Sequence, residues 1–497
     1  MIRFMIVGVL GFALVQMGTS STALAETSEK IFRLHLSTEP LSIDPAKQKG
    51  SGGLFLMNSI CAPLFKSDLN QIYQPSVLSQ CHWIGKQKLS CDMVPNLQWS
   101  NGQPITAHHI QKTFEYFMNP LTPMTHPELI QNIKTVQASS INKVIFNLSK
   151  EDPRFMEQLT SPLLCPIYDT QFPTKDKMNT LVTSGPYKIE KWVSKNKITL
   201  MPNTYYKGNT ERPKVEFLII PEEATALLLY ENNQLDFLRR VPTSYISQYQ
   251  KSPELYQIPL LRLDYIGFGP ALANEDRLRE QLALSLDYNQ WGQFMQAMGR
   301  PGCFGIAKSL VDSDPCLNYT PTQFETWKKE IHSRPRTPEL TLHFSTLGGS
   351  EHQKSMEWIQ NQWKKNLNLH INIKGVENSL FQKELREAPP PLFRLGVPIN
   401  HLSCYNALES FFHSTPFSGL PFKQKSFEDK LQKLRETTKN KSRENSLCHS
   451  ILDDLIRHHW IIPLGRIHSS ILVKSYWKGW KLTSLNVLDL SELHYQK

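Results

Sequence analysis

An α/β fold is predicted for this chain, because segments with strand periodicity alternate with segments with helical periodicity. Residues 31–37 (IFRLHLS) alternate apolar and polar side chains, as a half-buried strand does. Farther along, residues 339–344, 352–367 and 369–373 follow one another as strand, helix and strand. This succession is typical of α/β domains.

The remaining elements follow the same two periodicities. One helix is expected to begin after Thr106, which can cap it, and to place Ile110, Phe114 and Phe117 on one face. Further helices are expected at residues 54–62, 224–231, 275–286, 426–435 and 445–458. Further strands are expected within residues 77–93, 144–148, 187–200, 214–220, 265–268, 461–464 and 470–473.

The first 25 residues have the pattern of a secretory signal peptide. Arg3 is followed by the apolar run 4–17 and by small residues at Ala23 and Ala25, which predicts cleavage after Ala25. The alternative is a membrane anchor, but the run is shorter than the roughly 20 residues that span a bilayer. The first cysteine is Cys61, so no lipid-attachment site is expected. No later transmembrane helix is expected either, which predicts a soluble periplasmic protein.

Composition and motifs exclude several classes of function. The chain has 497 residues and a formal charge of +10, but its basic residues are scattered rather than gathered in a block with aromatic residues. Nucleic-acid binding is therefore not expected. No H-E-x-x-H, C-x-x-C or G-x-S-x-G motif is present. We expect no catalytic residue, no metal site and no cofactor.

The eight cysteines suit disulfides in an exported protein. Cys81 and Cys91 flank a short polar stretch and could face each other across a hairpin, and Cys303 and Cys316 could close a loop. The other four have no obvious partner by spacing and could equally be buried thiols. They are Cys61, Cys165, Cys404 and Cys448.

Seven short segments stand in the order in which a known family carries similar ones. They are residues 40–45 (PLSIDP), 97–107 (LQWSNGQPITA), 183–189 (TSGPYKI), 205–208 (YYKG), 233–236 (NQLD), 265–287 and 460–464 (WIIPL). In these segments the chain resembles the family 5 extracellular solute-binding proteins, the oligopeptide- and dipeptide-binding components of ABC importers. The most specific segment is 97–107, which is similar to the pattern W-S-x-G-x-P-x-T-A.

The resemblance implies a periplasmic binding protein-like clamshell of two lobes with an additional inserted domain (class II, cluster C type). Lobe I would comprise residues 26–68, 182–266 and 470–497, the inserted domain II residues 69–181, and lobe III residues 267–469. The lobes would close by hinge motion over a peptide or another small solute. The partner would be an ABC transporter permease in the inner membrane, and a monomer is expected.

The resemblance also indicates where ligand contacts would lie, and one position departs from the family. Peptide-binding members carry a G-W-x-A-D-Y-x-D-P loop whose first Asp pairs with the α-ammonium group of the ligand. Here residues 396–405 correspond, and Asn400 stands where that Asp should be, so it can accept a hydrogen bond but cannot neutralise an amine. The ligand contacts expected from this loop and from two other family segments are Asn400, His401, Ser403, Cys404, Tyr405, Asn406, Phe268, Gly269 and Leu41.

Alternatives remain open at this point. Within the same fold, the solute could be a metal chelate, haem or a sugar, and the missing charge at Asn400 leaves a blocked or longer peptide possible. Outside it, a periplasmic hydrolase and a peptide-holding chaperone or sensor are the rivals. Fold alone does not decide among them.

Overall fold

The computed structural model describes most of the chain: residues 30–48, 50–67, 73–296, 298–306, 311, 313–333, 339–399, 403–412, 425–437 and 440–496. The expected signal peptide at residues 1–25 lies outside the described residues, as do Asn400 and His401. Within the described ranges, no helix combines the length and the apolar character that crossing a bilayer requires.

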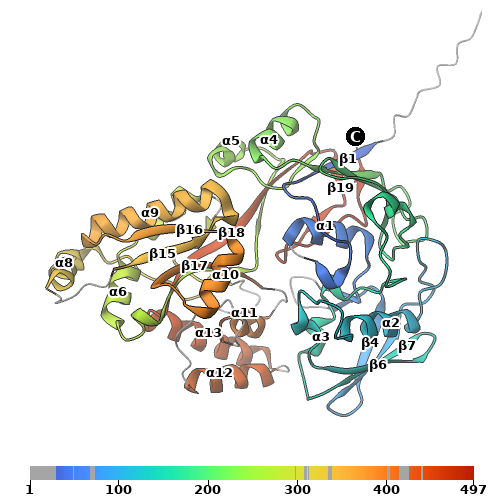
Figure 1. The fold of residues 1–497 in the computed structure, drawn as a ribbon, viewed down its shortest axis with the longest axis horizontal. Coiled ribbons are helices and arrows are strands. Elements are labelled where there is room, and N and C mark those ends of the chain that lie inside the picture. Colours follow the sequence, from blue (N-terminus) through green and yellow to red (C-terminus); the bar gives the residue numbers. More distant parts are fainter. Residues whose placement is uncertain are drawn as a thin grey trace, which may run out of the picture.

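Lobe I is built on one half of a sheet of twelve strands (Figure 1). Strand β1 pairs in parallel with β10, and its side chains Phe32 and Leu34 are buried with Phe55 of helix α1 (Gly50–Ile60). Helix α4 (Glu223–Glu231) belongs to a second, smaller core. The lobe I strands are β1 (Ile31–Leu36), β8 (Tyr187–Val193), β9 (Lys197–Pro202), β10 (Lys214–Ile219), β11 (Phe237–Leu238) and β12 (Leu255–Pro259).

The inserted domain is a separate four-stranded antiparallel sheet in the order β4-β5-β7-β6. Helix α2 (Ala107–Met118) packs on it with Ile110, Phe114 and Phe117 buried, and Thr106 is its N-cap, as the sequence predicted. Figure 1 shows this domain below α1, on the same side of the molecule as lobe I. Its strands are β4 (Leu78–Trp83), β5 (Lys88–Met93), β6 (Ile133–Ser140) and β7 (Lys143–Leu148).

Lobe III is the other half of the large sheet, covered on both faces. One face carries α6 (Asp276–Leu284) and α9 (Gly349–Leu367), whose apolar side chains pack on Ile266 and Phe268. The opposite face carries Leu263 and Tyr265 under the C-terminal helices. The strands are β13 (Arg262–Phe268), β15 (Thr341–Ser345), β16 (Asn372–Val376) and β17 (Leu392–Pro398), and the helices over the second face are α10 (Asn378–Glu387), α11 (Cys404–Phe412), α12 (Lys425–Glu436) and α13 (Lys441–Arg457).

One long strand belongs to both lobes. Strand β18 (Ile461–Val473) pairs with β13 through its first residues and with β12 and β11 through its last ones. The β13–β18 pairing has a register shift where Asp264 faces Gly465 and Tyr265 faces Pro463. The chain crosses between lobes a second time where β12 ends and β13 begins. The predicted lobe bounds stay a prediction, and the strand pairing favours crossings a few residues before 267 and 470.

All eight cysteines are paired. Cys81 lies opposite Cys91 in the β4–β5 hairpin and is bonded to it, and Cys303 is bonded to Cys316, the two pairs that the sequence singled out. The four cysteines without an obvious partner form Cys61–Cys165 and Cys404–Cys448. Both of these bonds join segments far apart along the chain, which is why spacing gave no sign of them.

Candidate functional site

The candidate ligand site lies between the lobes, where the loop that the sequence singled out meets the inserted domain. Ser403 precedes α11 and is fully buried, and its hydroxyl is hydrogen-bonded to the carboxylate of Glu157 in α3 (Phe155–Gln158). The Tyr405 hydroxyl donates to Glu409 at 2.7 Å, and its ring lies 5.2 Å from the Arg154 guanidinium. Two of the expected ligand residues therefore contact the other half of the molecule.

Two of the expected ligand residues have side chains inside the core of lobe III. Cys404 is buried in the lobe III core and its sulfur is bonded to Cys448. Phe268 is also fully buried, packed between β13 and the helices of its own lobe. Both side chains contribute to packing, and their ligand contacts stay predictions.

The remaining expected residues have diverse positions. Leu41 is 83% exposed, in the loop that follows β1. Gly269 is buried, its N–H donates to the Pro391 carbonyl, and a Cβ there would meet the Pro390 carbonyl oxygen at 2.2 Å. Close packing against the Pro390 backbone therefore explains why residue 269 is a glycine. Asn406 lies in α11, and Asn400 and His401 are outside the described residues, so their ligand contacts stay predictions.

A buried charged network, which sequence reasoning missed, lies in the lobe III sheet next to the crossing. Asp264 of β13 is fully buried and accepts hydrogen bonds from Arg394 Nη2 at 2.7 Å and Arg262 Nε at 2.6 Å. Arg394 Nη1 also contacts the ring of His352, in the first turns of α9. Burial and the neighbouring Arg394 charge lower the pKa of His352 to about 3, so the ring is neutral and accepts from the guanidinium.

This network fixes the position of the Arg262 guanidinium. The Arg262 side chain is 33% exposed, and it fits against β17 because position 396 is a glycine: a Cβ there would collide with the guanidinium. Asp264 restrains the guanidinium from one side, so Arg262 is pre-oriented for an anionic or carbonyl group. The signal was present in the sequence as Arg262, Asp264 and Arg394, three charges inside strands that are otherwise apolar.

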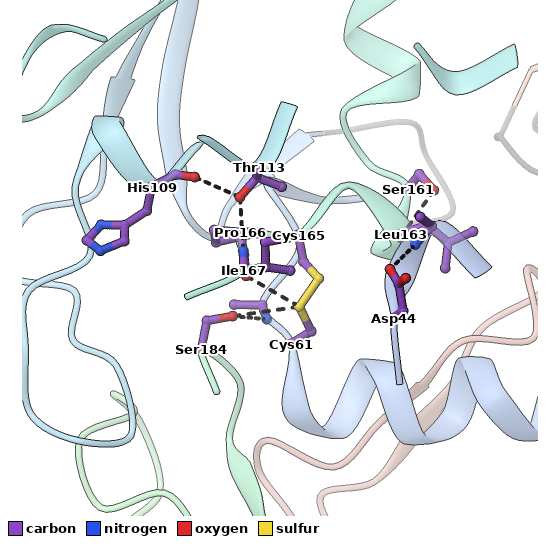
Figure 2. Close-up of a disulfide and its surroundings, with 12 residues drawn as sticks. Asp44, Cys61, His109, Thr113, Ser161, Leu163, Cys165, Pro166, Ile167 and Ser184 are labelled. Atoms are coloured by element: carbon purple, nitrogen blue, oxygen red, sulfur yellow. Dashed lines mark hydrogen bonds between the residues drawn. A yellow bond between two sulfur atoms is a disulfide. The ribbon is translucent and has the colours of Figure 1, made fainter. Parts of the chain in front are cut away.

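A second feature is a hollow of about 230 Å³ at the junction of lobe I and the inserted domain. Its lining is mainly apolar and includes Ile43, Trp99 and Phe172. Figure 2 shows the neighbouring Cys61–Cys165 disulfide. This hollow lies within one half of the clamshell, between parts that are covalently joined.

Hydrogen bonds hold the chain firmly beside that disulfide. The Ile167 amide donates to the Thr113 hydroxyl of α2 at 3.0 Å, and that hydroxyl donates to the His109 carbonyl at 2.7 Å (Figure 2). The Ala62 amide donates to Ser184 at 3.1 Å on the other side. The first two bonds lie within the inserted domain and the third within lobe I, and the Cys61–Cys165 disulfide joins these two ordered segments.

Comparison with known families decides the identity of this fold. The family model described as bacterial extracellular solute-binding proteins, family 5, middle part, matches residues 84–419, which is more than half of the chain. The chain belongs to this family. The two-lobe clamshell expected from the sequence is confirmed, and so is the resemblance on which it depended.

The names of this family 5 protein's relatives refer to more than one type of solute. It is 23% identical to the periplasmic murein peptide-binding protein MppA of Escherichia coli K12, over 72% of this chain and 73% of the relative. It is 22% identical to YgiS of the same strain, named a probable deoxycholate-binding periplasmic protein, over 70% of this chain and 72% of the relative.

A solved structure of similar fold carries a peptide. The Haemophilus influenzae OppA in complex with RPPGFSPFR has a TM-score of 0.75 and 18% identity to this family 5 protein, and covers 95% of this chain and 99% of that one. At this identity the comparison establishes the fold, and the ligand of that protein does not follow for this one.

Proposed function

We propose that this family 5 protein is an exported, monomeric binding protein that captures peptides between its lobes and delivers them to an ABC transporter permease, without altering them. The observation that carries the proposal is the family match over residues 84–419, within a family of solute-binding proteins. Relatives with peptide-binding names, such as MppA, support peptides as the solute. The predicted signal peptide supports a periplasmic location after cleavage behind Ala25.

The geometry is suited to such a task. Two lobes connected by two chain segments, the β12–β13 connection and strand β18, can close over a solute by hinge motion. Arg262, restrained by Asp264, offers a fixed cation next to the crossing. Strand edges and fixed polar groups recognise a peptide backbone without demanding particular side chains.

The test begins with protein from which bound solute has been removed. The chain starting at residue 26 is unfolded in denaturant, dialysed and refolded, and native mass spectrometry then records which members of a mixed peptide library bind. Complexes with several intact peptides are expected. Binding of a single non-peptide compound from the periplasm, with no peptide complex, would replace the proposal with the second candidate below, and peptide cleavage during incubation would indicate a hydrolase.

A second candidate is a non-peptide solute within the same fold. Asn400 stands where peptide-binding members have an Asp, and the similar protein YgiS is named a probable deoxycholate-binding protein. If peptides with a free amino terminus are the solute, Asn400→Asp tightens their binding, because a charged hydrogen bond is stronger than a neutral one by about 1–2 kcal/mol. N-acetylated peptides are the matched control, and they gain nothing. If calorimetry gives equal affinities of the wild type and Asn400→Asp for peptides with a free amino terminus, residue 400 does not contact the amino group of the ligand.

A further inference from the structure

A disulfide and a side-chain hydrogen bond join the inserted domain to lobe I. Cys61, which directly follows α1, is bonded to Cys165, which follows α3 in the inserted domain. The Tyr116 hydroxyl of α2 donates to Asp44 of lobe I at 2.6 Å. Lobe III, by contrast, is joined to lobe I through the two chain crossings. Any contact between the inserted domain and lobe III is therefore made when the clamshell closes and broken when it opens.

One arginine of the inserted domain makes three hydrogen bonds to lobe III. Arg154 directly precedes α3, and its Nη2 lies 2.9 Å from Glu444 Oε1, 3.0 Å from the Leu434 carbonyl and 3.1 Å from the Thr437 carbonyl. The two carbonyls belong to the C-terminal end of α12, where unpaired carbonyl groups and the helix dipole favour a cation. A guanidinium of the opposite half thus caps a lobe III helix.

The surroundings of the contact exclude water. Only 6% of the Arg154 side chain and 6% of the Glu444 side chain are exposed. The Tyr405 ring lies beside the guanidinium, and Asp152 faces Arg435 of α12 at 4.0 Å. In a dry site, charged hydrogen bonds are stronger than at the surface, and removal of one partner leaves the other without compensation.

Each charge also has a partner on its own side. Arg154 Nη1 contacts Glu157 Oε1 of α3 at 2.8 Å, and Lys441 Nζ lies 3.4 Å from Glu444 Oε2 within α13. When the halves separate, Arg154 keeps Glu157 and Glu444 keeps Lys441, and water solvates both pairs. Opening therefore leaves no isolated buried charge, so both arrangements are accessible and the balance between them depends on a few bonds.

We infer that Arg154, with Glu444 and the C-terminal end of α12, forms a latch beside the candidate ligand site that holds the clamshell closed through contacts within the chain. The latch shifts the equilibrium between open and closed molecules, and so changes the affinity for every solute by the same factor. Arg154 is in this sense a positioning residue. The latch follows from contacts within the chain and does not depend on whether the solute is a peptide.

Small-angle X-ray scattering on solute-free protein tests the latch directly. Arg154→Met and Glu444→Gln remove it from opposite halves, and both are expected to give a larger radius of gyration than the wild type. Arg277→Met is the matched control, because Arg277 forms an exposed ion pair with Glu330 far along the chain from this contact, and it leaves the radius unchanged. Circular dichroism confirms that each variant is folded.

Affinity measurements supply the second readout. For solutes of different size, both latch variants raise Kd by one common factor of roughly 10 to 100, the range expected from loss of a charged hydrogen bond, through faster dissociation. The double variant raises it little further, because both substitutions break the same contact. An unchanged radius in both single variants would overturn the latch, and so would a loss confined to one solute, which indicates direct solute contact. Failure to bind peptides would affect the proposed function alone, since the scattering test uses no solute.

Discussion

Replacing Asp264 by asparagine tests how much the buried network stabilises lobe III. Asp264 is fully buried, and its carboxylate accepts hydrogen bonds from Arg394 and Arg262. The other contact of the Arg394 guanidinium is with the neutral ring of His352. Asparagine retains the shape and one acceptor oxygen but removes the charge. Arg394, whose side chain is 6% exposed, then keeps its positive charge inside the protein without a counter-charge.

The expected loss is large because the pair is buried. Removing one member of a buried ion pair lowers the free energy of unfolding by about 3–5 kcal/mol, most of it from the charge left behind. The matched control is Glu330→Gln. Glu330 makes two hydrogen bonds of 3.0 Å with Arg277, but these side chains are 37% and 45% exposed, so water and ions screen the pair. There we expect a loss below about 1 kcal/mol.

Equilibrium urea unfolding followed by tryptophan fluorescence measures both losses, since Trp327 and Trp363 are fully buried in the same lobe. The double variant Asp264→Asn with Arg394→Met removes both charges and is expected to be more stable than the sum of the single losses predicts. Equal urea midpoints for Asp264→Asn and Glu330→Gln would refute the reasoning, because burial would then make no difference to the value of an ion pair.

Three further predictions concern acid, a disulfide and a close contact. Burial lowers the pKa of His35 from 6.5 to about 4 and that of His352 from 6.5 to about 3, so on acidification the unfolded chain takes up protons before the folded protein does. The free energy of unfolding is therefore retained above about pH 6.5 and decreases from there toward pH 4. His35→Gln is expected to reduce this decrease, measured as the difference between urea midpoints at pH 7.5 and pH 4.5. Replacing Cys404 and Cys448 by serine removes a disulfide between positions 44 residues apart and is expected to lower the free energy of unfolding by about 4 kcal/mol. An equal Tm for the wild type and this double variant in calorimetry would contradict the prediction. Gly185→Ala places a Cβ 2.5 Å from the Cys61 backbone nitrogen and is expected to lower the free energy of unfolding by about 1–3 kcal/mol. An unchanged urea midpoint would contradict this, because it would mean that the two backbone segments move apart at no cost.

Local features of the structure were predictable because neighbours in sequence settle them. The hairpin in residues 77–93 follows from two short strands and a polar turn, and it brings Cys81 opposite Cys91. Helix α2 follows from Thr106 as cap and from three apolar residues on one face. The family motif in residues 97–107 points to the same clamshell that the fold comparison shows.

The sequence misjudged features that depend on distant parts of the chain. Residues 461–464 and 470–473 were expected as two strands, yet they are the ends of the single strand β18, because its two halves find partners in different lobes. The order of short apolar runs does not show that one strand serves two lobes. Helix α8 (Phe324–His332) and strand β17 were not predicted.

The sequence by itself determined the α/β class, the family and two of the disulfides, since periodicity, motif order and short loops are properties of neighbouring residues. Only the tertiary structure decided that Cys61 meets Cys165, that Asp264 holds Arg394 and Arg262, and that Arg154 reaches across to Glu444. Contacts between residues this far apart are selected by packing and by the removal of charges from water, and neither is visible until the chain has folded.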